Sequence, residues 1–331
     1  MTRGVLQMQD FGRLGRWGNQ IFQYAFLKTY ARRHDLEVQI PAWVGEDLYG
    51  FRDARPDGGR YPLVVEKTEH GIDDTVIPHL AQPLADVNVE GWFQYHMSYY
   101  RPDKDYIQDL FGEPLPAVRQ RVAPPLEELR RRGDTLIGLH IRRGDFGTGA
   151  AYLTPLDWYR RLLEAKFAAW PRAVLFIATE DLSLVEQFRQ FHPLTVEDLG
   201  VDLKQEPMAK FIYLKQDLQR PDPRALDFFP DWYLLQHCDV LVLPNSTFGF
   251  TAAMTSRSCR QVFRSDPAVC GFAELSDWWD VMPAQFVNQA AFRHIPGLYL
   301  DRNPYWDRLA GLKRGLKKLR QGWRWVRSRL A

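Results

Sequence analysis

The second half of the chain has a pattern that leaves few folds open. From residue 135 onward, short apolar runs alternate with segments of helical spacing. The expected strands are 136–141, 173–178, 240–243 and 261–263, and the expected helices are 156–169, 182–191, 232–238 and 248–254. Short strands separated by helices form β-α-β units around a parallel sheet that is buried on both faces. This half is therefore predicted to be an α/β domain.

The first half is less regular. A strand is expected at 5–9, a helix at 20–33 and a further strand at 87–93, whereas 41–85 is rich in Pro, Gly and Asp and indicates loops with short elements. Prolines then cluster in 113–125. Because 331 residues suffice for about two domains of ~150 residues, we place one domain at 1–125 and a second at 126–300. A separate C-terminal segment covers 301–331.

The cysteines argue against both disulfides and zinc. The chain has an odd number of cysteines, Cys238, Cys259 and Cys270, and no two of them form a Cys-x-x-Cys pair. The first ten residues lack the apolar core of a signal peptide, and no run approaches the roughly 18 apolar residues of a membrane span. We therefore expect a cytoplasmic protein.

Positive charge is concentrated at the C-terminus. The chain has 43 basic and 41 acidic residues, and eight of the basic residues lie in 311–331, which has no acid. The remaining body has 35 basic and 41 acidic residues, a net charge of −6, so we expect no nucleic-acid partner. Leucines, Trp323 and Val326 form one apolar stripe along the basic segment. This pattern indicates an amphipathic helix at an anionic membrane surface, on the inner face of the plasma membrane, with docking onto protein as the alternative.

Polar side chains follow the strands of the second half, where doubly wound sheets bind ligands. Because alternate residues of a strand share a face, His140 and Arg142 point together and Arg143 points the other way. A guanidinium at this edge suits the oxygens of a diphosphate. The alternative is an arginine paired with a surface carboxylate.

A second candidate anion site follows strand 240–243. Asn245, Ser246 and Thr247 precede the next expected helix, whose first amides and positive dipole end attract anions. A plain capped helix is the alternative. At the neighbouring strand end, Glu180 is a candidate to bind a ribose or base, while Asp181 is equally suited to cap a helix.

One acidic motif has the spacing of a metal site. Asp103 and Asp105 could chelate a divalent cation, but they come directly before an expected helix and lack a strong preceding strand. We favour a helix start, and predict no metal.

Five blocks of the sequence, in order, resemble one family. They are Gly15–Arg16–Trp17–Gly18–Asn19–Gln20 with the aromatic helix that follows, Gly91–Trp92–Phe93–Gln94, His140 to Asp145, Phe176 to Asp181, and Asp231 to Asp239 leading to Asn245–Phe248. These resemble the motifs of the α-1,2-fucosyltransferases, glycosyltransferase family eleven, which are related to α-1,6- and protein O-fucosyltransferases. Arg16 and Trp17 replace the family's small apolar pair, and Gly249–Phe250 replaces its frequent serine and tryptophans.

The resemblance implies a GT-B-like α/β fold in which two Rossmann-like domains face a cleft. Residues 1–125 would form the acceptor side and 126–300 would bind GDP-L-fucose, without a cofactor or metal. The implied catalytic residues are Arg142, His140 and Asp145; the donor-binding residues are Asp231, Asn245, Ser246, Thr247, Phe248 and Glu180; the positioning residues are Gly18, Asn19, Gln20 and Gln94. Asp145 and Glu180 are also candidate bases.

The expected function is therefore inverting transfer of L-fucose from GDP-L-fucose to a hydroxyl, the 2-OH of a galactose, in an oligosaccharide or lipid-linked precursor of a surface glycan. Two alternatives stay open at this point. One keeps the fold but changes the donor or the linkage, to α-1,6 or O-linked fucose. The second is a non-catalytic protein that binds sugar nucleotides or glycans.

Overall fold

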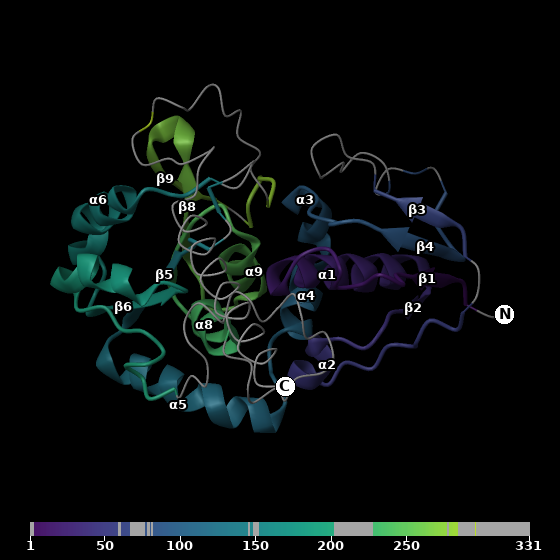
Figure 1. Cartoon of the computed structure of the whole chain (residues 1–331), viewed down its shortest axis with the longest axis horizontal. Helices are drawn as coiled ribbons and strands as arrows, with labels where there is room; N and C mark the ends of the chain where they lie inside the picture. Colours follow the sequence, from purple (N-terminus) through teal and green to yellow (C-terminus); the bar gives the residue numbers. More distant parts are fainter. Residues whose placement is uncertain are drawn as a thin grey trace, which may run out of the picture.

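The computed structural model describes residues 3–58, 61–66, 77, 80, 82–144, 146–147, 152–201, 228–276, 278–283 and 295. Within these residues the chain forms two sheets, one in each half (Figure 1). The expected amphipathic helix at 311–331 and the candidate site residue Asp145 lie outside the described residues. None of the helices in the described part is long and apolar enough to span a bilayer.

The C-terminal half has the predicted parallel sheet, with one addition at its edge. Its strands are β5 (Thr135–Ile141), β6 (Ala173–Thr179), β7 (Val240–Leu243), β8 (Gln261–Asp266) and β9 (Gly271–Leu275), in the order β6-β5-β7-β8-β9. The first four are parallel, which confirms the prediction. The last strand, β9, pairs antiparallel with β8, and was not expected. The short turn η7 (Pro267–Val269) joins these two strands and allows the antiparallel return.

Helices cover both faces of this sheet. They are α6 (Leu156–Lys166), η3 (Phe167–Ala169), η4 (Leu182–Phe191), α8 (Phe228–Gln236) and α9 (Thr247–Thr255). Alternate residues of β5 enter different cores: Leu136 packs into the cluster that contains α8 and α9, while Ile137 packs into the cluster with α6 and η4. The two-sided burial explains why these strands are apolar along their whole length.

The N-terminal half is built on a smaller parallel sheet. Its strands are β1 (Val5–Gln7), β2 (Glu37–Gln39), β3 (Leu63–Val65) and β4 (Val87–Glu90), in the order β2-β1-β4-β3. The long helix α1 (Trp17–His34) connects β1 to β2, and α2 (Val44–Tyr49) follows β2. The sequence pattern predicted β1, α1 and β4 but neither β2 nor β3, each of which has only three residues.

Three short elements and one long helix join the halves. After β4 come α3 (Met97–Tyr100), η2 (Arg101–Asp103), α4 (Lys104–Leu110) and α5 (Pro116–Arg132). Residue 125, where the sequence placed the domain boundary, lies inside α5. The helix accommodates both Pro124 and Pro125. Proline in a helix interior removes a hydrogen-bond donor, yet α5 continues and packs on α8 and β5.

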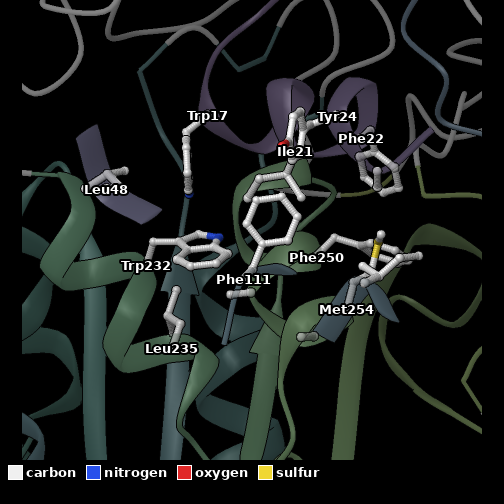
Figure 2. Packing of buried hydrophobic residues seen from close by; sticks show 14 of the residues in the cluster. Trp17, Ile21, Phe22, Tyr24, Leu48, Phe111, Trp232, Leu235, Phe250 and Met254 are labelled. Carbon is white, nitrogen blue, oxygen red and sulfur yellow. The ribbon is translucent and has the colours of Figure 1, made fainter. Parts of the chain in front are cut away.

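Aromatic side chains fill the region where the two halves meet. Trp17 at the start of α1 is completely buried and points toward Trp232 of α8, with Phe111 beside them (Figure 2). Further along α1, Phe22 packs against Phe250 of α9. The largest core cluster therefore runs through both halves without interruption, and fixes α1 against α8 and α9.

Candidate functional site

The starts of two helices meet where the halves join. Gly18, in the first turn of α1, lies against the backbone of Thr247 and Phe248 at the start of α9; a Cβ added at Gly18 would be only 2.5 Å from the carbonyl carbon of Thr247. Only a residue without a side chain allows this approach. Two motifs separated by more than half of the chain are thereby in direct contact.

Asn19 connects three of the blocks found in the sequence. Its Oδ1 accepts a hydrogen bond from Gln94 Nε2, at 2.7 Å, and a second from Thr247 Oγ1, at 2.9 Å. An amide oxygen can only accept, so Gln94 and Thr247 must both donate, and this fixes the orientation of all three side chains. The acceptor-side candidates Gly18, Asn19 and Gln94 are thus brought together with Thr247 of the donor side.

The loop before α1 is held by Gln23, which was not among the candidate site residues. Gln23, one turn into α1, accepts a hydrogen bond from Gly12 N–H and donates to the carbonyl of Leu14. Gly15 has a φ of +83°, and a Cβ there would lie 1.9 Å from Asn19 Nδ2. A buried glutamine on an otherwise apolar stretch of helix was the available signal for this role.

Arg142 follows β5 and is paired with an acid. Its Nη1 lies 3.4 Å from Glu180 Oε1, and the same oxygen accepts a hydrogen bond from the backbone N–H of Arg143 at 2.7 Å. The ring of Phe146 lies against the Arg142 guanidinium, at 5.5 Å. Glu180 therefore holds the end of β5 and orients Arg142, and its contact with a ribose or base stays a prediction.

Arg143 points to the other side of the sheet, as the alternation predicted. Its guanidinium is buried and donates to the carbonyls of Arg142 and Thr154. These contacts hold the chain after β5 in place.

His140 is buried below the start of α9. Its ring lies 5.2 Å from that of Phe248, and a Cβ added at Gly249 would be 2.7 Å from His140 Nδ1. Burial and the nearby charge of Arg142 lower the pKa of His140 to about 3. The imidazole is therefore neutral at physiological pH, and its buried Nδ1 has no hydrogen-bond partner among the described residues.

The turn after β7 presents the start of α9 at the same edge of the sheet. Ser246 caps the helix by accepting from Phe248 N–H, as the residue type predicted. Asn245 precedes it, and its Oδ1 accepts a hydrogen bond from Arg264 Nη2 at 3.0 Å. The sequence did not single out Arg264, which directly follows the expected strand 261–263 and lies inside β8 (Gln261–Asp266), although a buried arginine is an informative exception.

Two further candidate residues are buried close to this region. Asp231 lies in the first turn of α8 and is 6% exposed. Gln20 lies in α1, is 3% exposed, and its Oε1 has no hydrogen-bond partner among the described residues. Both side chains are thus polar groups held inside the structure.

Glu66 supports the N-terminal half, although no sequence motif pointed to it. It follows β3, and its Oε2 accepts hydrogen bonds from the backbone N–H groups of Trp92 and Phe93. Phe93 has a left-handed φ of +52°, which these bonds help to hold. The segment that ends in Gln94 is thereby given a defined shape.

Two acidic candidates have ordinary structural partners. Asp103 forms an ion pair with Arg33 directly before α4, so the interpretation of this motif as a helix start is confirmed. Asp181 caps η4 by accepting from Ser183 N–H. The part of the chain that the structure describes holds no group of three or more His, Cys, Asp or Glu arranged to bind a metal ion.

With two parallel Rossmann-like sheets and polar residues at their junction, the molecule has the GT-B fold of nucleotide-sugar transferases. A scan of protein-family models and a search of curated proteins gave no match. Solved structures do match. NodZ α-1,6-fucosyltransferase soaked with GDP-fucose has a TM-score of 0.55 and 13% identity, over 83% of this chain and 100% of that chain.

Two more structures support the same fold. The fucosyltransferase NodZ from Bradyrhizobium has a TM-score of 0.54 at 12% identity, over 83% of this chain and 99% of that chain. A mutant of Arabidopsis thaliana FUT1 in complex with GDP has a TM-score of 0.54 at 13% identity, over 88% of this chain and 78% of that chain. The predicted GT-B fold is confirmed, because this chain has the fold of the matched fucosyltransferase structures.

Proposed function

We propose that the protein is a GDP-fucose-dependent glycosyltransferase that moves L-fucose to a hydroxyl group of a glycan. The fold likeness to fucosyltransferases supports this proposal, and so does the resemblance of five sequence blocks to the α-1,2-fucosyltransferases. Among the matched structures, NodZ was soaked with GDP-fucose and the plant protein is in complex with GDP, so the nucleotide of the proposed donor recurs in this fold.

One observation carries the proposal. Asn19 Oδ1 accepts from Gln94 of the N-terminal half and from Thr247 of the C-terminal half. These three side chains come from three of the sequence blocks that resemble the family, and they form a polar cluster beside the apolar packing that joins the halves. A substrate bound there would contact both halves at once.

The chemistry that we propose depends on the leaving group. The bond between fucose C1 and the β-phosphate oxygen breaks, a bond from the acceptor oxygen to C1 forms, and the hydroxyl proton leaves. Negative charge then develops on the diphosphate, where Arg142 and the first amides of α9 would stabilise it. Because these groups supply the positive charge, we expect activity without a divalent metal, which an assay in EDTA tests.

The remaining candidates are assigned around this reaction. Asp231 would bind the nucleoside, Ser246 and Phe248 would shape the diphosphate site, and Asn19 with Gln94 would position the sugar or acceptor. Glu180 already holds Arg142 and the Arg143 amide, so we assign it to orientation. Asp145 stays the candidate base, although oxocarbenium-like transfer can proceed with little help from a base.

We favour the 2-OH of galactose as the acceptor group, because the sequence blocks resemble those of α-1,2 enzymes. An α-1,6 linkage is the second candidate, since NodZ α-1,6-fucosyltransferase is among the matched structures. O-linked fucose transfer and non-catalytic binding of sugar nucleotides or glycans are the third and fourth candidates.

An acceptor screen distinguishes these functions. Oligosaccharides that end in galactose or in other sugars are incubated with GDP-fucose or GDP-mannose, and each product linkage is determined by NMR. We expect GDP release and an α-1,2-fucosylated galactose with GDP-fucose alone. An α-1,6-linked product would show that the proposed α-1,2 linkage is wrong, and transfer of mannose would show that the proposed donor is wrong. Binding of GDP-fucose without release of GDP on any acceptor would contradict the proposal that the protein is a transferase.

We also propose that the basic segment at 311–331 binds an anionic membrane surface, so that the enzyme works on lipid-linked acceptors at the cytoplasmic side. The support is its sequence alone: eight basic residues around one apolar stripe. Liposome flotation tests it, with the full chain and a chain ending at residue 310. Equal flotation of the two on phosphatidylserine-containing vesicles would contradict this role.

A further inference from the structure

Arg264 is a buried arginine at the same sheet edge. It lies in β8, opposite Leu243 of β7, and is 1% exposed. Its guanidinium donates to Asn245 Oδ1 and to the carbonyls of Met282 and Pro283. Its Nε is buried and has no partner among the described residues. The side chain is therefore fixed directly behind the turn that begins α9.

The charge of Arg264 is not offset by an ion pair within the described part of the chain. Buried arginines ordinarily pair with a carboxylate, because an isolated buried charge is costly. None of the described carboxylates lies within ion-pair distance of this guanidinium. Asp266 and Tyr152 are the titratable groups that act on it from further away, and Asp266 Oδ1 already accepts from Ala268 N–H. Burial lowers the pKa of Arg264 to about 10, so the group stays protonated at neutral pH.

Arg142 differs from Arg264 in this respect. Its charge faces Glu180 at 3.4 Å, so a carboxylate offsets part of the positive charge that Arg142 brings to the edge of the sheet. A nucleoside diphosphate brings about two or three negative charges, which need a net positive environment. On the sheet face that α9 covers, Arg264 is, among the described residues of this edge, the buried guanidinium that no carboxylate offsets.

The two arginines stand on either side of the start of α9. Arg142 and Arg264 extend from the sheet face that α9 covers, by the alternation of β5 and β8. Two strand spacings, about 10 Å, separate their backbones, with β7 and its turn between them. Two aromatic residues of α9 contact the two positions. Phe248 packs on His140, two residues before Arg142, and the ring of Phe250 lies 5.1 Å from the Arg264 guanidinium.

We infer that Arg264 is a positioning residue of the donor site, which holds Asn245 and supplies the buried positive charge that the diphosphate of the nucleotide offsets. The inference rests on the proposed function and deepens it, because it names a second cationic group for the same ligand. Arg264 acts by holding Asn245 and through the electrostatic potential of its charge, rather than by contact with the reacting atoms.

The experiment compares three ligands that differ in phosphate number. Dissociation constants for GDP, GMP and guanosine are measured by calorimetry on the full chain and on Arg264→Gln, Arg264→Lys and Arg143→Gln. Arg143 is the matched control, because it is also a buried arginine that donates to two carbonyls, but it lies on the opposite face of the sheet.

We expect Arg264→Gln to lower the preference for GDP over guanosine by about tenfold, the effect of losing one charged donor. Arg264→Lys keeps the charge and should retain the preference within about threefold, and Arg143→Gln should leave it unchanged. An equal loss of affinity for all three ligands in Arg264→Gln would mean that the residue only packs, and would overturn the inference.

A second variant keeps the test valid if Arg264→Gln does not fold. Asn245→Asp places a carboxylate where the amide oxygen lies 3.0 Å from the guanidinium, and so neutralises the charge without removing a side chain. We expect a higher melting temperature and a reduced preference for GDP. An unchanged preference would contradict the role of Arg264. A wild-type protein that binds no GDP would instead refute the proposed function, and this inference with it.

Discussion

The two sheets of the molecule are held together by different means. In the C-terminal half, β5 and β6 have seven residues each and are buried along almost their whole length. In the N-terminal half, the strands have three or four residues, and polar side chains complete them. Asp86 accepts from Val5 N–H across 81 residues, and Asn88 accepts from Gln9 N–H across 79. The short strands of the N-terminal sheet therefore combine apolar packing with side-chain contacts at their ends, whereas β5 and β6 have long buried runs.

This difference matters for the site, because each half contributes a different kind of component. The C-terminal sheet provides a rigid edge from which Arg142, the turn after β7 and Arg264 extend. The N-terminal half provides Asn19 and Gln94, which are held by side chains such as Gln23 and by the packing of α1. Substitutions should therefore act on folding where the halves meet, and on chemistry at the C-terminal edge.

The largest effect is expected where the halves share their core. Trp17→Ala removes a completely buried ring that lies 5.9 Å from Trp43 and 5.4 Å from Trp232. Loss of a large buried aromatic costs about 3–5 kcal/mol, through the lost burial and the cavity left behind. Urea unfolding followed by fluorescence measures it. Trp170→Ala, at a half-buried site within the C-terminal half alone, is the control and should cost clearly less; equal costs would mean that the shared core is not special.

Trp17 also shows where the sequence could be read and where it could not. The pattern predicted a helix at 20–33, so Trp17 fell outside it, although α1 begins at this residue. In the structure the indole packs into the core between the halves. The apolar periodicity of a helix specifies its buried face, whereas the partner of that face depends on segments far away in sequence.

The sequence likewise predicted some features of the candidate site and missed others. Alternation along β5 correctly separated Arg142 from Arg143, and the parallel sheet followed from β-α-β connectivity. The pairing of Arg142 with Glu180, the contact of Asn245 with Arg264 and the support of the segment before Gln94 by Glu66 were not predictable, because each joins residues from different strands. The antiparallel β9 was missed for a similar reason, since its pairing is set by the turn before it.

The second prediction tests the C-terminal edge. Arg142→Ala should lower turnover by roughly 10²-fold or more, because it removes a donor to the charge that develops on the leaving diphosphate. Rates of GDP release with GDP-fucose and an acceptor measure the effect. Arg143→Gln, on the opposite face, should lower the melting temperature while turnover per folded molecule stays close to wild type. If both variants lost activity equally, the assignment of Arg142 over Arg143 would be wrong.

The third prediction concerns the contact between the two halves. Gly18→Ala places a Cβ at 2.5 Å from the Thr247 carbonyl carbon, and this atom belongs to the backbone, so α1 and α9 must move apart. We expect a cost of about 1–3 kcal/mol in unfolding free energy, together with reduced activity, as Asn19 loses its contact with Thr247. Gly271→Ala in β9 is the control, since its nearest neighbour would be at an ordinary 3.5 Å. A tolerated Gly18→Ala with full activity would remove the argument that this contact builds the site.

The smallest predicted effect concerns the stability of the protein in acid. Burial and the charge of Arg142 lower the pKa of His140 to about 3, whereas the unfolded chain has the ordinary value near 6.5. Between these two values the unfolded state binds a proton that the folded state does not, so stability rises with pH there and is lost as pH falls below about 6.5. Relative to pH 8, this one group removes about 1.4 kcal/mol by about pH 5.5.

The measurement is the difference in unfolding free energy between pH 8 and pH 5.5. His140→Gln should make that loss smaller by about the same 1.4 kcal/mol, because a neutral amide does not titrate. His34→Gln, on the exposed last turn of α1, is the matched removal of an imidazole from the N-terminal half. Burial of His237 also lowers the pKa of that group, so some acid sensitivity persists in every variant, and the comparison isolates His140. Equal losses in His140→Gln and wild type would mean that the ring can take up a proton in the folded state, and would make His140 a candidate acid–base group again.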